Sequence, residues 1–149
     1  MLTVKRLLAV SLVFMASVAS ADGVHIGGYL SKISVSGVNG KTQAATLIGT
    51  TENQGRRFYP LFIMVEVTAA NTIAVAATAS VGTNASSYNN VLTASALTGL
   101  TSANASLAFV PTLTAIASVS PGTGIFLNVT TGATATTCTL KASVLGYYE

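Results

Sequence analysis

The sequence predicts an all-β protein: a single β-sandwich of jelly-roll type, built from about eight to ten short antiparallel strands. Apolar residues alternate with Ser, Thr or Asn over much of the chain, which is the period of a strand with one buried face. Clusters of Gly, Pro, Asn and Ser separate these runs, as turns do. Only residues 90–97 suggest a helix, and that helix would be short.

The N-terminal segment predicts export. Lys5 and Arg6 precede an apolar stretch over 7–18, and small residues ending at Ala21 follow it. This order predicts a signal peptide over 1–21, with the protein then extracellular, on the cell surface or periplasmic. An uncleaved anchor is the alternative and would be the protein's only contact with a membrane, although the stretch is shorter than the roughly 20 residues of a membrane span.

Residues 22–149 are numerous enough for one domain with its own core, and we expect the β-sandwich domain there. Ile33 and Val35 alternate with serines and predict its first strand. Asn39-Gly40 then predicts a hairpin turn, because both residues tolerate positive φ. The next strands are expected over 42–48, 61–67 and 73–81. Residues 61–67 are apolar on both faces until Glu66, which predicts a central strand covered on two sides.

The second half continues the strand pattern. Leu107 and Phe109 alternate before Pro111, and Ser120 to Gly124 form a dense turn signal. Further strands are expected over 113–119, 125–130 and 140–148.

The chain is poor in residues that perform catalysis. It has one histidine (His25), one cysteine (Cys138) and one aspartate (Asp22), whereas enzymes gather acids, bases and nucleophiles in one pocket. Glu52 and Glu66 are the only interior carboxylates, and their presence does not argue for a glycosidase centre. We therefore expect no enzyme, no catalytic residue, no metal and no cofactor.

The charge balance excludes nucleic acid as a partner. Without residues 1–21, five basic and four acidic residues remain, a net charge of about +1, and no cluster of Lys and Arg stands out. About a quarter of the remaining residues are Ser or Thr. A hydroxyl-rich surface of low charge tolerates contact with its own copies, which favours a self-assembling homo-oligomer.

Residues 52–60 concentrate charge, amides and aromatic rings in a chain otherwise poor in them. Arg56 and Arg57 are candidates to bind a carboxylate, a phosphate or an acidic sugar, with Tyr59 beside them. The alternative is a structural loop, in which one arginine pairs with a glutamate while Phe58 and Tyr59 enter the core.

A second polar loop, 82–90, surrounds one tyrosine. Tyr88 and Asn89 are candidate contacts for a surface glycan or a protein, since such loops bind through hydrogen bonds and ring contact. The alternative is an ordinary connection between strands. Cys138 has no partner for an internal disulfide, so it is either a buried small hydrophobe or forms a bridge between chains.

The start of the domain has the pattern of a donor strand. Val24, Ile26 and Leu30 alternate with other residues and could complete the sheet of a neighbouring copy. The penultimate Tyr148 is similar to the ending of chaperone-usher pilins, whose usual cysteine pair this chain lacks.

The chain also resembles small β-sandwich proteins of tailed bacteriophages. The resemblance rests on 48–60 (IGTTENQGRRFYP), on 80–84 (SVGTN), on 124–131 (GIFLNVTT) and on the closing Gly-Tyr-Tyr, and it covers about two-thirds of the chain. It implies a virion surface, fibre or decoration role without an enzymatic site. The sequence thus predicts a non-enzymatic, exported structural or adhesive surface protein that acts through self-assembly. A virion fibre or decoration protein, or a glycan-binding module, is the alternative.

Overall fold

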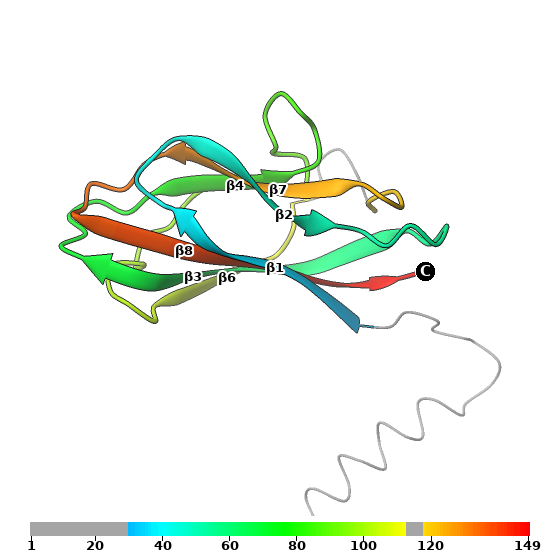
Figure 1. Ribbon diagram of the computed structural model, residues 1–149, viewed down its shortest axis with the longest axis horizontal. Coiled ribbons are helices and arrows are strands. Elements are labelled where there is room, and N and C mark those ends of the chain that lie inside the picture. Colours follow the sequence, from blue (N-terminus) through cyan, green and yellow to red (C-terminus); the bar gives the residue numbers. More distant parts are fainter. Residues whose placement is uncertain (1–29, 113–117) are drawn as a thin grey trace, which may run out of the picture.

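Eight β-strands make up the described part of the protein (Figure 1). The structure, a computed structural model, describes residues 30–112 and 118–149, and these residues contain no helix. The prediction of an all-β fold is therefore confirmed for these residues. The strands are β1 Leu30–Asn39, β2 Ala44–Thr50, β3 Phe58–Asn71, β4 Thr78–Gly82, β5 Leu92–Ala96, β6 Ser106–Phe109, β7 Gly124–Thr131 and β8 Thr137–Tyr148.

Several sequence-based predictions lie outside the described residues. They are the signal peptide over 1–21, the candidate donor residues Val24 and Ile26, and most of the strand expected over 113–119.

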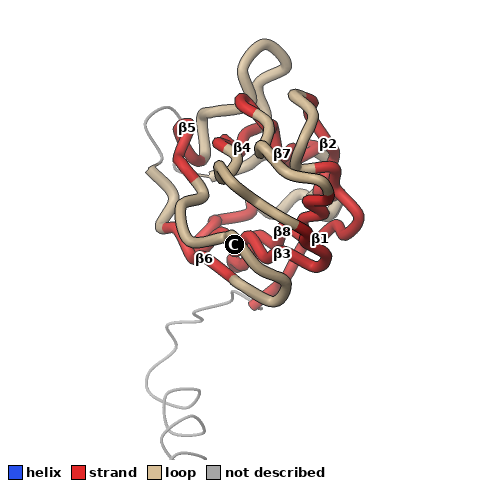
Figure 2. Tube along the Cα trace, turned by 90° about the vertical axis from the view of Figure 1, so that its left-hand side faces the viewer, coloured by secondary structure: helices blue, strands red, loops and turns tan. Residues whose placement is uncertain are grey.

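The strands form two antiparallel sheets of four. One sheet has the order β1-β8-β3-β6 and the other has the order β2-β7-β4-β5. In Figure 1 the first sheet lies below the second, and Figure 2 shows the same two layers from the side. Every connection except the one between β4 and β5 carries the chain from one sheet to the other.

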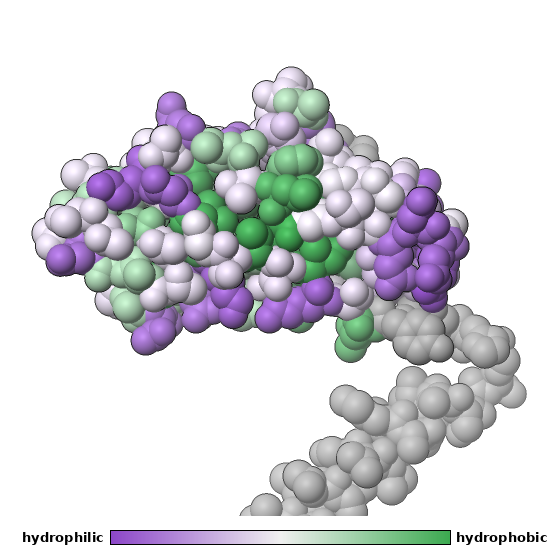
Figure 3. Space-filling model, in the orientation of Figure 1, coloured by the Kyte–Doolittle hydropathy of each residue, from purple (hydrophilic) through white to green (hydrophobic). Residues whose placement is uncertain are grey.

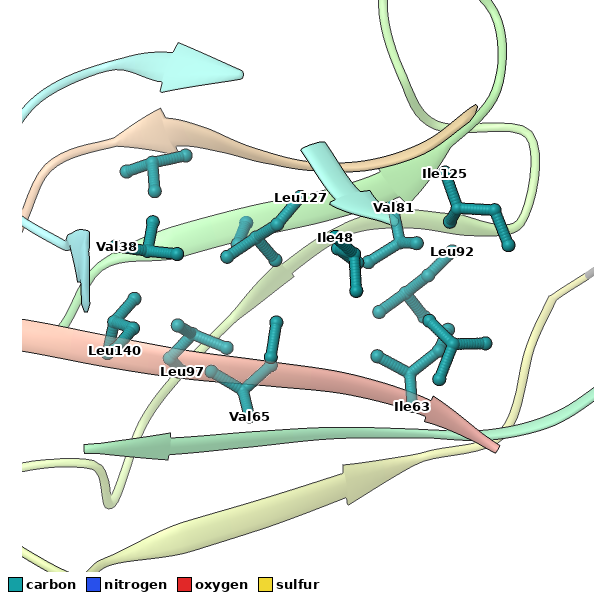
Figure 4. Close-up of a cluster of buried hydrophobic side chains, with 14 of the residues drawn as sticks. Val38, Ile48, Ile63, Val65, Val81, Leu92, Leu97, Ile125, Leu127 and Leu140 are labelled. Atoms are coloured by element: carbon teal, nitrogen blue, oxygen red, sulfur yellow. The ribbon is translucent and has the colours of Figure 1, made fainter. Parts of the chain in front are cut away.

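Apolar side chains fill the space between the two sheets. Ile63, Val65 and Val67 alternate along β3 on its inner face and are almost completely buried. They belong to one core cluster with Val81 of β4 and Leu127 of β7. Figure 4 shows Ile63 and Val65 facing Val81 and Leu127 between the layers. Burying a side chain of this size stabilises the fold by about 1.5–3 kcal/mol, so this cluster holds the sheets together.

The side between β1 and β2 is closed by a contact that needs a glycine. A band of hydrophobic residues is visible there between the two sheets (Figure 3). The Cγ2 atom of Ile33 in β1 lies where a side chain at Gly49 of β2 would begin. Gly49 therefore lets the two edge strands approach each other.

The prediction of a hairpin at Asn39-Gly40 is wrong. A turn does follow β1, but β1 pairs with β8 and β2 pairs with β7, so the turn joins two sheets. The Gly40 N–H donates to the Cys138 carbonyl at 2.9 Å, and the Gly40 carbonyl accepts from Ala133 at 2.8 Å. These bonds, one to β8 and one to the segment between β7 and β8, take the place of a ladder between β1 and β2.

Two further expectations need correction. The helix suggested over 90–97 is strand β5, because the backbone of this segment pairs with β4, with Leu92 opposite Val81. Of the strand expected over 73–81, only the end becomes β4, because Val75 makes a single bridge to Thr134 and its side chain is exposed.

Candidate functional site

The first group of candidate residues lies in the segment that joins β2 to β3. Backbone bonds tie this segment to the C-terminus: the Arg57 N–H donates to the Glu149 carbonyl at 2.8 Å, and the Glu149 N–H donates to the Arg57 carbonyl at 3.0 Å. Phe58 and Val119 exchange a second such pair, at 2.9 and 2.7 Å. Hydrophilic side chains gather at this end of the molecule (Figure 3).

The two arginine side chains of this segment have partners within the chain. Arg56 forms an ion pair with Glu52 at 2.9 Å, and its guanidinium lies 5.8 Å from the ring centre of Tyr148. The Nε–H of Arg57 donates to the Ser118 hydroxyl at 2.6 Å. Both side chains thus help to hold the segment in place, which is the arrangement expected of a structural loop.

Tyr59 lies beside the arginines but on the outer face of the β1-β8-β3-β6 sheet. Its ring stacks on that of Tyr147, with centres 5.0 Å apart and planes 8° from parallel. Phe58 is fully buried, as a structural loop requires, whereas Tyr59 is only half-buried. The fold therefore brings Arg56, Arg57 and Tyr59 together around the last residues of β8.

Tyr88 and Asn89 lie elsewhere, on the outer face of the β2-β7-β4-β5 sheet. The Tyr88 ring packs on Phe126 of β7, with centres 4.7 Å apart. Its backbone has a positive φ of 48°, which turns the loop back over the sheet. Gly82 permits this path, because a Cβ there would overlap the backbone of Tyr88 and Asn89.

Amide side chains fix the shape of this loop. Asn90 accepts a hydrogen bond from the Thr83 N–H at 2.8 Å and donates to the Thr83 hydroxyl at 3.0 Å. Asn84 accepts from the Asn89 N–H at 2.9 Å, and its amide donates to the Asn89 side chain at 3.1 Å. The loop is thus built in one conformation, with Asn89 exposed to solvent.

The remaining polar candidates are separate from one another. Glu66 pairs across strands with Lys141 at 3.4 Å, and the Glu52 carboxylate is paired with Arg56. Cys138 is buried beneath Gly40, and burial raises the pKa of its thiol above the ordinary value. Within residues 30–112 and 118–149, no three His, Cys, Asp or Glu side chains come together as a metal site would require.

Leu30, the last of the candidate donor residues, is the first residue of β1. Its backbone pairs with Tyr147 of β8, so this residue already belongs to the sheet of its own chain. No helix in the described part of the chain is long and apolar enough to cross a membrane.

Sequence analysis missed one feature of the surface. β3 is apolar on both faces, as expected, but only its inner face is covered: Leu61, Phe62 and Met64 are exposed. The signal was present in the double-sided apolar pattern of 61–67. That pattern predicts a strand covered on two sides, and in the described part of the chain only the β2-β7-β4-β5 sheet covers it.

The fold is similar to that of several solved bacteriophage capsid structures. A chain of the cyanophage Pam1 capsid asymmetric unit matches with a TM-score of 0.55 at 23% identity, covering 86% of this chain and 91% of that one. The expected resemblance to virion proteins of bacteriophages is confirmed for the fold. A chain of the capsid of Ralstonia phage GP4 matches with a TM-score of 0.54 at 15% identity, covering 82% and 84% of the two chains.

A third match has the same character. A chain of the acid-stable capsid of Helicobacter pylori bacteriophage KHP30 matches with a TM-score of 0.51 at 14% identity, covering 82% of this chain and 87% of that one. No protein-family model and no curated protein sequence matches the chain. The similarity therefore lies in the three-dimensional arrangement of the strands.

Proposed function

We propose that this protein is a non-enzymatic structural component of a bacteriophage-type virion and forms part of its shell. The observation that carries this proposal is the similarity to three phage capsid chains over at least 82% of this chain. The match also spans 84–91% of those chains, so it concerns whole domains of similar size.

We further propose that the domain is a jelly roll. The support comes from the strand orders β1-β8-β3-β6 and β2-β7-β4-β5, in which eight strands wrap back and forth between two sheets. Jelly rolls are eight-stranded two-sheet domains common in viral capsids, where they act as building blocks. This topology makes the virion proposal consistent with the fold class expected from the sequence.

The polar chemistry of the chain supports a structural role over a catalytic one. The carboxylates of Glu52 and Glu66 are paired with Arg56 and Lys141, and Arg57 is bonded to Ser118. These side chains hold strands and loops together. Catalysis in such a protein would need groups poised toward a substrate instead.

The test is to find the chain in particles. Virion-like particles are purified from lysates of the strain that carries the gene, washed in high salt and banded in a density gradient. Mass spectrometry then compares the amount of this chain with that of the main shell protein. We expect a fixed ratio across the particle band, with the particle-free fractions as the control. A chain absent from the particles and recovered instead from the cell envelope would overturn the proposal.

Export, which residues 1–21 predict, remains a prediction and is tested on the same lysates and particles. An intact mass that corresponds to residues 22–149 would show that the signal is removed, and fractionation would show where the product accumulates. Glycan contact through Tyr88 and Asn89, or through Arg56, Arg57 and Tyr59, also remains a prediction. Binding on a glycan array that the Asn89→Ala variant loses would support an adhesive role of the loop.

A further inference from the structure

The outer face of the β1-β8-β3-β6 sheet carries an apolar patch. Cross-strand register identifies its members. Ile63, Val65 and Val67 of β3 point into the core, so the residues between them point outward. We call the following outward-facing residues the outer apolar face: Leu30 of β1, Leu145 and Tyr147 of β8, and Tyr59, Phe62 and Met64 of β3.

The members of the outer apolar face are neighbours in space. Leu30 lies opposite Tyr147, and Tyr147 lies opposite Tyr59, so one row crosses three strands. Leu145 lies opposite Phe62 in the next row. A β-bulge between Pro60 and Phe62 separates the two rows on β3. The patch is thus continuous across the two central strands, β8 and β3, and extends to the end of the sheet where β1 and β3 begin.

This face is exposed in the single chain. The exposed fractions are 81% for Leu30, 50% for Phe62 and 40% for Met64. A patch of this kind is comparable to the largest that a soluble monomer leaves in water, and such patches are often sites of protein–protein contact. A central strand that is apolar on both faces is typical of a sheet covered on both sides.

The charges on this face do not oppose contact between two copies. The outward-facing residues of β1, β8, β3 and β6 include only three charged side chains, those of Lys32, Glu66 and Lys141. Glu66 and Lys141 pair with each other within the face. Lys32 lies on the edge strand opposite Leu145, at the border of the outer apolar face, so Phe62 and Met64 of one copy can meet those of another without facing this charge.

The size of the face suits a pair of copies. Strands lie about 4.8 Å apart and rise about 3.3 Å per residue, so the whole outer side of β1, β8 and β3, which is the outer apolar face together with the polar residues around it, presents on the order of 500 Å². Two copies packed face to face would bury about 1,000 Å² in total, which is near the lower bound for a specific interface. Aromatic residues, here Phe62, Tyr59 and Tyr147, are the type that contributes most to such contacts.

We infer that the outer apolar face binds a second copy of this chain, with the same surface on both partners. The inference deepens the proposed function, since it names the contact by which shell components of this kind would associate. A two-fold contact of this type is closed, so it yields a defined pair and leaves the β2-β7-β4-β5 sheet free for other neighbours.

The test measures molar mass by light scattering from micromolar to millimolar concentration. The chain is expressed from its full coding sequence and purified as the cell processes it. The test variant is Phe62→Ser with Met64→Ser, and the control is Val75→Ser, which removes a 59%-exposed apolar side chain outside this face. We expect the wild type and the control to form pairs. The test variant should need a concentration at least about ten-fold higher than the wild type to pair to the same extent.

Circular dichroism establishes that each variant is folded. If the double variant does not fold, Met64→Gln alone replaces an exposed side chain by a polar one of similar size, and we expect several-fold weaker pairing. A wild-type chain that stays single at every concentration would overturn the inference, because another shell protein or residues 22–29 of the same chain would then cover the face. Pairing that survives in the test variant would overturn it too.

The outcome is separable from that of the particle experiment. Pairing through this face in a chain that is absent from particles would leave the inference standing and remove the virion role. A single chain that is nevertheless incorporated into particles would do the reverse.

Discussion

The hydroxyl oxygen of Tyr148 accepts a hydrogen bond from the backbone N–H of Glu52 at 3.0 Å. Tyr148 is buried near the end of β8, and Glu52 lies in the segment that leaves β2, so this bond links the two sheets. The Tyr148 ring also packs on Phe58, with centres 5.0 Å apart. One side chain therefore fixes the segment that carries Arg56 and Arg57 against the C-terminus.

Replacement of Tyr148 by Phe should destabilise the protein by about 1–2 kcal/mol, because the Glu52 N–H loses its acceptor while the ring contact remains. Urea unfolding followed by circular dichroism measures the change. Tyr147→Phe is the matched control, since it removes the neighbouring hydroxyl and keeps the stacking on Tyr59. Equal stability of the two variants would contradict the role assigned to the bond.

Much of the fold could be predicted from local sequence patterns. Period-two alternation predicts the strands that contain Ile33, Leu127 and Val144, because in each of them one face packs toward the core and the other does not. The strand that contains Ile63 is predicted instead by its continuous apolar run. The strand β5 was missed because its short apolar pattern fits a helix equally well, and only pairing with β4 decides between them.

The sheet assignment and the site depended on contacts that local patterns do not contain. Asn39-Gly40 has the composition of a hairpin turn, and its bonds to Cys138 and Ala133 redirect the chain into the other sheet. The candidate residues near Tyr59 and the loop around Tyr88 are separate in the sequence and lie on different sheets. The exposed side of Phe62 could not be predicted, because an apolar pattern shows that a face needs a cover without showing which chain supplies it.

Gly49 provides a test of the contact between the two edge strands. Gly49→Ala should destabilise the protein by about 1–3 kcal/mol, because the new methyl group overlaps Cγ2 of Ile33. Ile33→Leu removes that branch, so the double variant should recover part of the loss. Thermal unfolding of the two single variants and the double variant measures the coupling. Strictly additive effects would contradict a direct contact between β1 and β2 at this point.

The hydrogen bonds that asparagine side chains make in the loop 82–90 should contribute unequally to the stability of the protein. Asn90→Ala should cost about 1–2 kcal/mol, because the partly buried Thr83 N–H loses its acceptor. Asn89→Ala removes an exposed side chain and should change the stability by less than about 0.5 kcal/mol. Asn90→Asp retains an acceptor oxygen and should fall between them. Denaturant unfolding of the three variants gives the order, and a larger effect at Asn89 would contradict the arrangement.

Cys138 should react slowly in the folded protein. Its side chain is buried against Gly40, and burial raises the pKa of the thiol, so the reactive thiolate is scarce at neutral pH. Labelling with a thiol reagent should be slow in buffer and rapid in urea. Under oxidising conditions the folded chain should form no covalent dimer, and rapid labelling in buffer would contradict this placement.

The raised pKa of the Cys138 thiol also predicts how the stability of the protein changes with pH. The unfolded thiol ionises near its ordinary pKa, about 8.5, while the folded thiol keeps its proton to higher pH. Above that value the unfolded state binds fewer protons than the folded state, so the free energy of unfolding falls as the pH rises. The difference in stability between the wild type and Cys138→Ala should therefore shrink from pH 7 to pH 10. This subtraction removes the contributions of lysines and tyrosines common to both chains, and a constant difference would show that Cys138 is not desolvated in the folded protein.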